Sequence, residues 1–153
     1  MTHPSQSPHA SPRALRVAHA HASREPRVSP SVLIVEDHED TRFILKTLIE
    51  MSGYRVLEAG DGFEALEIAE RERPDIVVMD GSLPFLDGLS TTRRLREHTS
   101  GRDLPVVILS GHTTPEYQAD ALAAGCDGYL AKPIDFDQLQ AILQRLLRDR
   151  ATQ

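Results

Sequence analysis

Continuous apolar runs of four residues recur along this chain, and each run ends in polar or turn-forming residues. The clearest runs are residues 32–35, 76–79 and 106–109, which are built from Val, Ile, Leu and Met. Runs of this length without alternation are typical of strands buried on both faces, as in a parallel sheet covered by helices. Residues 128–131 form a shorter strand, and residues 54–58 alternate less cleanly, which predicts an edge strand. We therefore expect five strands.

Helices are predicted between these strands from the spacing of apolar residues. The last helix has one apolar stripe, made of Phe136, Leu139, Ile142, Leu143 and Leu146. The first helix is expected to begin at His38 and to be ended by Gly53, and its inward residues are expected to be Ile44, Leu45, Leu48 and Ile49. Three further helices are expected to begin at Asp61, Asp87 and Pro115. Alternating strands and helices predict an α/β fold with a parallel sheet and right-handed crossovers.

The folded domain is expected to span residues 31–149, between an N-terminal tail at 1–30 and a short C-terminal tail at 150–153. Residues 1–30 contain five Pro, five Ser and four of the seven His without a hydrophobic period, which predicts disorder. This tail carries four Arg against one Glu, a balance of +3. Because the whole chain has a formal charge of −6, the remainder carries −9.

Composition excludes several classes of function. An acidic body argues against a nucleic-acid surface, which needs clustered Lys and Arg. No apolar run is long enough for a membrane span. The single cysteine, Cys126, cannot form an internal disulfide, which favours a cytoplasmic location. We expect Cys126 to be a small, partly buried residue without a redox role.

Residues suited to phosphate chemistry follow four of the five predicted strands. They are Glu36 and Asp37, Asp80, Ser110 and Lys132. The carboxyl ends of parallel strands meet at one edge of a sheet, where open α/β sheets place their ligand sites. One carboxylate at a strand end is usually a helix cap, but three acids, a hydroxyl and a lysine at the same edge indicate a site.

The three acids predict a bound Mg²⁺. Three carboxylates within a few ångströms repel one another unless a cation compensates, and an all-oxygen site of this charge suits Mg²⁺. The alternative is a helix N-terminus that happens to be acidic, which we accept for Asp40 but not for Glu36 and Asp37. With Mg²⁺ bound, Asp80 is expected to attack phosphorus and form an acyl phosphate. The Lys132 ammonium and the Ser110 hydroxyl would contact the other phosphoryl oxygens.

Five motifs of this sequence resemble the receiver domain of two-component response regulators, in family order and spacing. They are Val35-Glu36-Asp37, Met79-Asp80 with Leu83-Pro84, Asp87-Gly88, Leu109-Ser110-Gly111, and Tyr129-Leu130-Ala131-Lys132-Pro133. The resemblance covers residues 31–149. It implies a flavodoxin-like, five-stranded parallel sheet of order 2-1-3-4-5 with five helices on both faces. That order places Glu36 and Asp37 beside Asp80.

The resemblance also implies roles for individual residues. Asp80 would accept a phosphoryl group from a histidine kinase or a histidine phosphotransfer protein. Asp37 would bind Mg²⁺ directly, Glu36 would bind it through water, and the backbone carbonyl of Ser82 would be a further ligand. Ser110 and Lys132 would contact the phosphoryl group. Tyr129 matches the aromatic switch residue that turns inward when the hydroxyl residue moves toward phosphate, although an ordinary strand tyrosine is the alternative. The Lys132–Pro133 bond is often cis in the family.

Some positions depart from the usual family pattern. Gly81-Ser82-Leu83 replaces the commoner bulky-x-Met, and Gly111 stands where Ala is usual, which should loosen the loop. His112 is two residues past Ser110, a position that tunes phosphate lifetime in the family. We predict that His112 and Ser82 set the dephosphorylation rate.

The signal is expected to leave through a protein contact. No helix-turn-helix, cyclase or methylesterase segment follows Arg150, so we expect a stand-alone receiver. The usual family surface is formed here by residues 115–124, residues 128–131 and the last helix, and includes Tyr117 and Tyr129. Receivers also form homodimers through that surface, and the sequence leaves the oligomeric state open.

Three other classes share parts of this pattern. A phosphoaspartate-forming phosphatase would need an Asp-x-Asp pair, but Ser82 takes the place of the general acid. We therefore expect no enzyme activity beyond the protein's own phosphorylation and dephosphorylation. A flavin carrier would need a phosphate-binding loop where this chain has Glu-Asp-His-Glu-Asp. A non-phosphorylated docking module remains the alternative, although the complete set of acids, hydroxyl and lysine argues against it.

Overall fold

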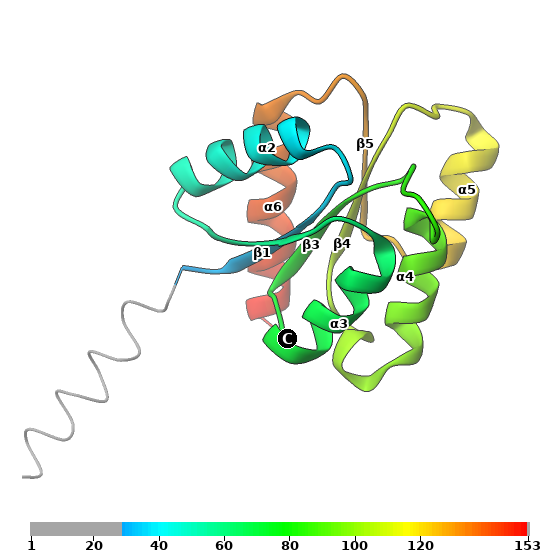
Figure 1. Ribbon diagram of the computed structural model, residues 1–153, viewed down its shortest axis with the longest axis horizontal. Coiled ribbons are helices and arrows are strands. Elements are labelled where there is room, and N and C mark those ends of the chain that lie inside the picture. The colour runs from blue at the N-terminus through cyan, green and yellow to red at the C-terminus, as the bar shows by residue number, and fades with distance from the viewer. Residues whose placement is uncertain (1–28, 153) are drawn as a thin grey trace, which may run out of the picture.

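The structure, a computed structural model, describes residues 29–152 as a parallel five-stranded sheet with helices on both faces (Figure 1). Its strands are β1 (Ser31–Val35), β2 (Arg55–Ala59), β3 (Ile76–Asp80), β4 (Val106–Ser110) and β5 (Gly128–Ala131). The helices are α2 (Glu39–Met51), α3 (Gly62–Glu72), α4 (Gly88–Glu97), α5 (Pro115–Ala124) and α6 (Phe136–Ala151), with a 3₁₀ turn η1 (Thr99–Gly101). The strand order is 2-1-3-4-5, which confirms the predicted fold.

The register of the strands brings the predicted site residues to one edge of the sheet. Val35 pairs with Met79, so Glu36 and Asp80 are the next residues along two neighbouring strands. Ser110 and Asp80 are the last residues of their own strands. The backbone N–H of Lys132 donates to the carbonyl of Ser110 at 2.8 Å, which ties the end of β5 to the end of β4.

Two hydrophobic cores lie on opposite faces of the sheet. On one face, Leu45 and Ile49 of α2 pack with Leu139 and Leu143 of α6. On the other face, α3, α4 and α5 contribute Ala65, Ile68, Ala69, Leu89, Leu95, Ala121 and Ala124. Figure 1 shows α2 and α6 together on one side of the strands and the other three helices on the opposite side. The central strands β1, β3 and β4 are buried along their whole length, as their continuous apolar runs predicted.

Side-chain caps fix the starts of four helices. Asp61, Asp87, Thr114 and Asp135 each accept a hydrogen bond from a backbone N–H in the first turn of the helix that follows. Helix α5 begins at Pro115 and ends before Gly125, whose φ of 98° is easily adopted only without a side chain.

The structure corrects several local predictions. His38 precedes α2 as its N-cap residue and is not its first helical residue. Ile44 was predicted to face inward but is 58% exposed, because α2 is anchored by Leu45 and Ile49 and turns Ile44 to the edge of the contact. The edge strand predicted at 54–58 lies one residue later, at Arg55–Ala59.

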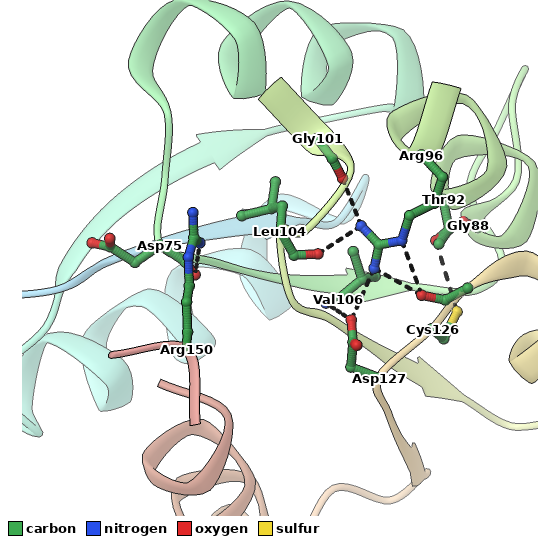
Figure 2. Close-up of polar contacts among 11 residues, drawn as sticks. Asp75, Gly88, Thr92, Arg96, Gly101, Leu104, Val106, Cys126, Asp127 and Arg150 are labelled. Atoms are coloured by element: carbon green, nitrogen blue, oxygen red, sulfur yellow. Dashed lines mark hydrogen bonds and ion pairs between the residues drawn. The ribbon is translucent and has the colours of Figure 1, made fainter. Parts of the chain in front are cut away.

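The C-terminal boundary also differs from the prediction. Residues 150–153 were expected to be a tail, but α6 continues to Ala151. The guanidinium of Arg150 donates a hydrogen bond to the backbone carbonyl of Asp75 just before β3 (Figure 2), which holds the end of the helix against the sheet. The predicted N-terminal tail falls almost entirely on residues 1–28, outside the described residues. None of the helices between residues 29 and 152 has the length and apolar character needed to cross a membrane.

Candidate active site

Asp80 lies buried at the carboxyl end of β3, with only 6% of its surface exposed. Its Oδ1 atom accepts a hydrogen bond from the backbone N–H of Ser82 at 2.9 Å. The ammonium Nζ of Lys132 lies 3.2 Å from the same oxygen. A buried carboxylate held by a lysine and a backbone N–H has a fixed orientation, which is a requirement for an in-line nucleophile.

Two further carboxylates lie beside Asp80, at the end of β1. Glu36 is 3% exposed, and one ligand atom each of Glu36, Asp37 and His38 lie within 4.8 Å of one another. Glu36 Oε2 and Asp37 Oδ1 are buried and make no hydrogen bond to the described residues. The His38 Nδ1 atom lies 3.3 Å from Asp37 Oδ1, without the geometry of a hydrogen bond.

The environment of Glu36 disfavours its charged form. Burial raises the pKa of this carboxyl from 4.5 to about 8; the Asp80 carboxylate beside it adds to the rise, and Lys132 opposes it. A buried acid with an unpartnered oxygen and a neighbouring carboxylate is costly unless a cation or a proton compensates. The donor set of carboxylate oxygens from Glu36, Asp37 and Asp80 therefore fits a hard divalent cation such as Mg²⁺.

Ser110 completes the site from the end of β4. Its side chain is fully buried, and its hydroxyl accepts a hydrogen bond from the backbone N–H of His112 at 3.0 Å. Because Leu109 pairs with Asp80 in the β3–β4 register, Ser110 lies one residue beyond the level of Asp80 on the adjacent strand. The structure thus brings together all five residues that the strand ends predicted.

The acids open into a cavity of about 600 Å³ with two different walls. Glu36, Asp80, Ser82 and Lys132 line its polar part. The apolar part is lined by Ile44, Leu45, Leu48, Ile134 and Phe136, from α2 and from the segment that leads into α6. The polar part is suited to a small anion bound together with a metal cation. The apolar part could contact the apolar surface of a larger ligand.

The remaining predicted residues surround the mouth of the site. Ser82 and His112 are exposed. Tyr129 is half-buried with a buried hydroxyl, and its ring centroid lies 6.0 Å from that of Tyr117. The Lys132–Pro133 peptide is cis, as the resemblance implied. A methyl group on Gly111 would meet no heavy atom within 4 Å, so the loop there is open.

Sequence reasoning missed the role of Gly88. This residue was expected only at the start of a helix, but a Cβ atom there would lie 2.6 Å from the backbone carbonyl of Asp80 and 2.9 Å from Gly81 Cα. The backbone N–H of Gly88 also donates to the carbonyl of Gly81 at 3.1 Å. A close approach of the first turn of α4 to the acceptor loop therefore requires glycine. The Asp-Gly pair itself was the available signal.

The match to a known family agrees with this geometry. Residues 32–144 match the model of the response regulator receiver domain. The chain belongs to this family of two-component signalling domains.

Curated relatives are about twice as long as the matched segment. The chain is 40% identical over 117 residues to response regulator MprA of Mycobacterium leprae, covering 76% of this chain and 50% of the relative. It is also 40% identical over 124 residues to the transcriptional regulatory protein PrrA of Mycobacterium tuberculosis, covering 81% and 52%. The chain thus spans about half the length of these relatives.

Solved structures show the same fold. The receiver domain of the sensor histidine kinase PA1611 from Pseudomonas aeruginosa has a TM-score of 0.73 and 38% identity, over 78% of this chain and 98% of that chain. That crystal structure holds a magnesium ion coordinated in its active site cleft. The chemotaxis protein CheY4 of Vibrio cholerae has a TM-score of 0.74 and 30% identity, over 78% and 99%.

Proposed function

We propose that this protein accepts a phosphoryl group on Asp80 from a histidine kinase or a histidine phosphotransfer protein, in a Mg²⁺-dependent reaction. The observation that supports this most directly is the buried Asp80 carboxylate between two further acids and the Lys132 ammonium, 3.2 Å away. Three acids, a lysine and a buried serine hydroxyl at one sheet edge support phosphoryl transfer to Asp80.

In the proposed transfer, an Asp80 carboxylate oxygen attacks phosphorus, and the phosphorus–nitrogen bond of a phosphohistidine breaks. The departing imidazole keeps the electron pair of the broken bond. Lys132 lies against Asp80 Oδ1, and its ammonium would neutralise charge on one phosphoryl oxygen. The Ser110 hydroxyl, at the end of the neighbouring strand, would donate to another.

Glu36, Asp37 and Asp80 would hold the Mg²⁺, together with the backbone carbonyl of Ser82. When bound, Mg²⁺ would offset the repulsion among the acids and neutralise charge on the transferred group. The unpartnered buried oxygens of Glu36 and Asp37 are the observation that fits this role.

The response would leave through a protein surface. The face formed by α5, β5 and α6 contains Tyr129 and part of Tyr117, and has a surface hollow lined by Leu122, Cys126, Tyr129 and Ile142. A downstream protein or a second copy of the chain would bind there. We propose a protein contact and not nucleic acid for residues 29–152, because residues 32–144 match the receiver domain and the part of this chain after residue 30 is acidic. The proposed setting is the cytoplasm.

The alternative function is a docking module that is never phosphorylated. In that case, substitutions of Glu36, Asp37 or Asp80 would leave binding of the downstream partner unchanged. A phosphatase acting on other molecules is disfavoured, because Ser82 provides no general acid. Apart from its own phosphorylation and dephosphorylation, the protein would catalyse nothing.

Intact-mass spectrometry after incubation with acetyl phosphate and Mg²⁺ tests the proposal. One added phosphoryl group is expected, dependent on Mg²⁺, lost in hydroxylamine and absent from Asp80→Asn. Absence of both the adduct and beryllofluoride binding in the wild-type protein would refute phosphorylation and favour the docking module.

A further inference from the structure

Tyr117 reaches from α5 to the residue that follows the acceptor aspartate. A Cβ atom built on Gly81 would overlap the Tyr117 hydroxyl, and the same point lies 3.5 Å from both Ser110 Cβ and Ile108 Cγ2. The hydroxyl therefore occupies the space that a side chain at position 81 would take. Only the glycine at this position allows the tyrosine to enter.

The inward position of this hydroxyl is costly as it stands. Its oxygen is buried and makes no hydrogen bond to the described residues. Burial raises the pKa of Tyr117, and the neighbouring Ser110 hydroxyl counteracts part of that rise. An unsatisfied buried hydroxyl destabilises the folded state, so a ring without the hydroxyl would fill the space at lower cost.

The backbone and neighbouring rings hold Tyr117 in this position. Its N–H donates to the Thr114 hydroxyl at 3.2 Å, in the first turn of α5. Its ring lies between His112, with centroids 5.1 Å apart, and Tyr129, with centroids 6.0 Å apart. A shift of the Tyr117 hydroxyl would therefore also move the first turn of α5 and the Tyr129 ring.

The hydrogen-bonding capacity of Ser110 indicates what Tyr117 binds. A serine hydroxyl has one proton to donate and two lone pairs that accept. One lone pair already accepts from the His112 N–H. When Ser110 donates its proton to a phosphoryl oxygen on Asp80, its second lone pair can still accept a hydrogen bond. The neighbouring Tyr117 hydroxyl is buried and has a proton to donate.

We propose that Tyr117 is a positioning residue for the phosphoryl group: its hydroxyl donates to Ser110 while Ser110 donates to the phosphoryl oxygen. This inference rests on the proposed function of Asp80. The chain phenol–serine–phosphoryl is cooperative, since each hydrogen bond polarises the next. Occupancy of the acceptor site thereby satisfies a buried hydroxyl and fixes the first turn of α5, through a residue other than the family's aromatic switch position, Tyr129.

Binding of beryllofluoride to the full chain in Mg²⁺, followed by ¹⁹F NMR titration, tests the proposal. Tyr117→Phe keeps the ring and removes the donor, and is expected to weaken beryllofluoride binding by about fivefold, the value of one hydrogen bond. Its stability to urea should equal or exceed that of the wild type, because an unsatisfied buried hydroxyl has been removed. Tyr54→Phe, which removes a phenol from the opposite core, is the matched control and should leave the affinity unchanged.

Gly81→Ala provides the second variant. The added methyl group should expel the hydroxyl and weaken binding in the wild-type background, yet add little in the Tyr117→Phe background. Wild-type affinity in Tyr117→Phe, or fully additive effects of the two substitutions, would overturn the inference while leaving Asp80 as the acceptor. No beryllofluoride binding by the wild type would remove the proposed function and this inference together.

Discussion

The Lys132 ammonium lies 3.2 Å from Oδ1 of Asp80, although Lys132 follows β5 and Asp80 ends β3, with β4 between these two strands in the sheet. The lysine holds the carboxylate in place, and in the proposed transfer it would also neutralise the phosphoryl group on Asp80.

Lys132→Ala is therefore expected to slow phosphorylation by acetyl phosphate on the order of 100-fold, as loss of one preorganised charge-stabilising donor does. The rate of adduct formation by intact-mass spectrometry measures this. Lys46→Ala is the matched control, because Lys46 pairs with Glu58 at 3.4 Å on the surface. An unchanged rate in Lys132→Ala would remove the lysine from the transfer step.

Glu36 should make the stability of the metal-free protein depend on pH. Its folded-state pKa of about 8 lies above the unfolded value of 4.5, so the folded protein binds the proton more tightly. The resulting contribution to folding stability is fully present below pH 4.5 and is lost as pH rises through about 8.

Urea midpoints measured in EDTA should therefore fall across this pH range, and Glu36→Gln should flatten the dependence. Added Mg²⁺ should offset the loss at high pH. Identical pH profiles for the wild type and Glu36→Gln would contradict this account.

Gly88→Ala should disturb the acceptor loop from the side of α4. The new methyl group would lie 2.6 Å from the Asp80 carbonyl, and backbone on both sides must move to accommodate it. We expect a loss of ~2 kcal/mol in the free energy of unfolding, as overpacking causes, together with slower phosphorylation. Gly111→Ala is the matched control for stability, because a methyl group there meets nothing within 4 Å. Equal stability of the two variants would show that the first turn of α4 adjusts freely.

Arg96 clamps the opposite end of the sheet (Figure 2). Its guanidinium donates to the backbone carbonyls of Gly101, Leu104 and Gly125, each at 2.7 Å, and to the Asp127 carboxylate at 2.8 Å. Arg96→Ala would leave these acceptors without their donor, and should cost about 3 kcal/mol in the free energy of unfolding. Chemical denaturation measures this.

The clamp lies away from the acceptor edge, so the phosphorylation rate of folded Arg96→Ala should match that of the wild type. Arg93→Ala, an exposed position on the same helix, serves as the control for stability. If Arg96→Ala lowered the free energy of unfolding no more than Arg93→Ala does, water would be able to replace the guanidinium as the donor to these carbonyls.

His112 and Ser82 are expected to control how long the phosphoryl group persists. Both are exposed at the mouth of the site, and the His112 ring packs on Tyr117. Replacing both by alanine should admit water to the acyl phosphate and shorten its half-life severalfold, measured after removal of acetyl phosphate. An unchanged half-life in the double variant would exclude this role.

Much of the site could be predicted because it depends on strand ends. Glu36 and Lys132 each follow a short strand, and Asp80 and Ser110 each end one. Parallel strands bring their carboxyl ends together whatever the details of packing. The alternation of strands and helices likewise determined the fold class, since it leaves few topologies for one sheet.

The tertiary structure decided what depends on how helices pack and on what surrounds each group. The raised pKa of Glu36 follows from burial beside Asp80, which no local sequence pattern reports. The exposure of Ile44 follows from the rotation of α2 on the sheet. The contact of the Tyr117 hydroxyl with Gly81 joins a helix to a loop that is remote in sequence, and it exists only because α5 lies where the missing side chain leaves room. Periodicity along the chain determined which residues reach the edge of the sheet; packing between elements determined their protonation, their exposure and their neighbours.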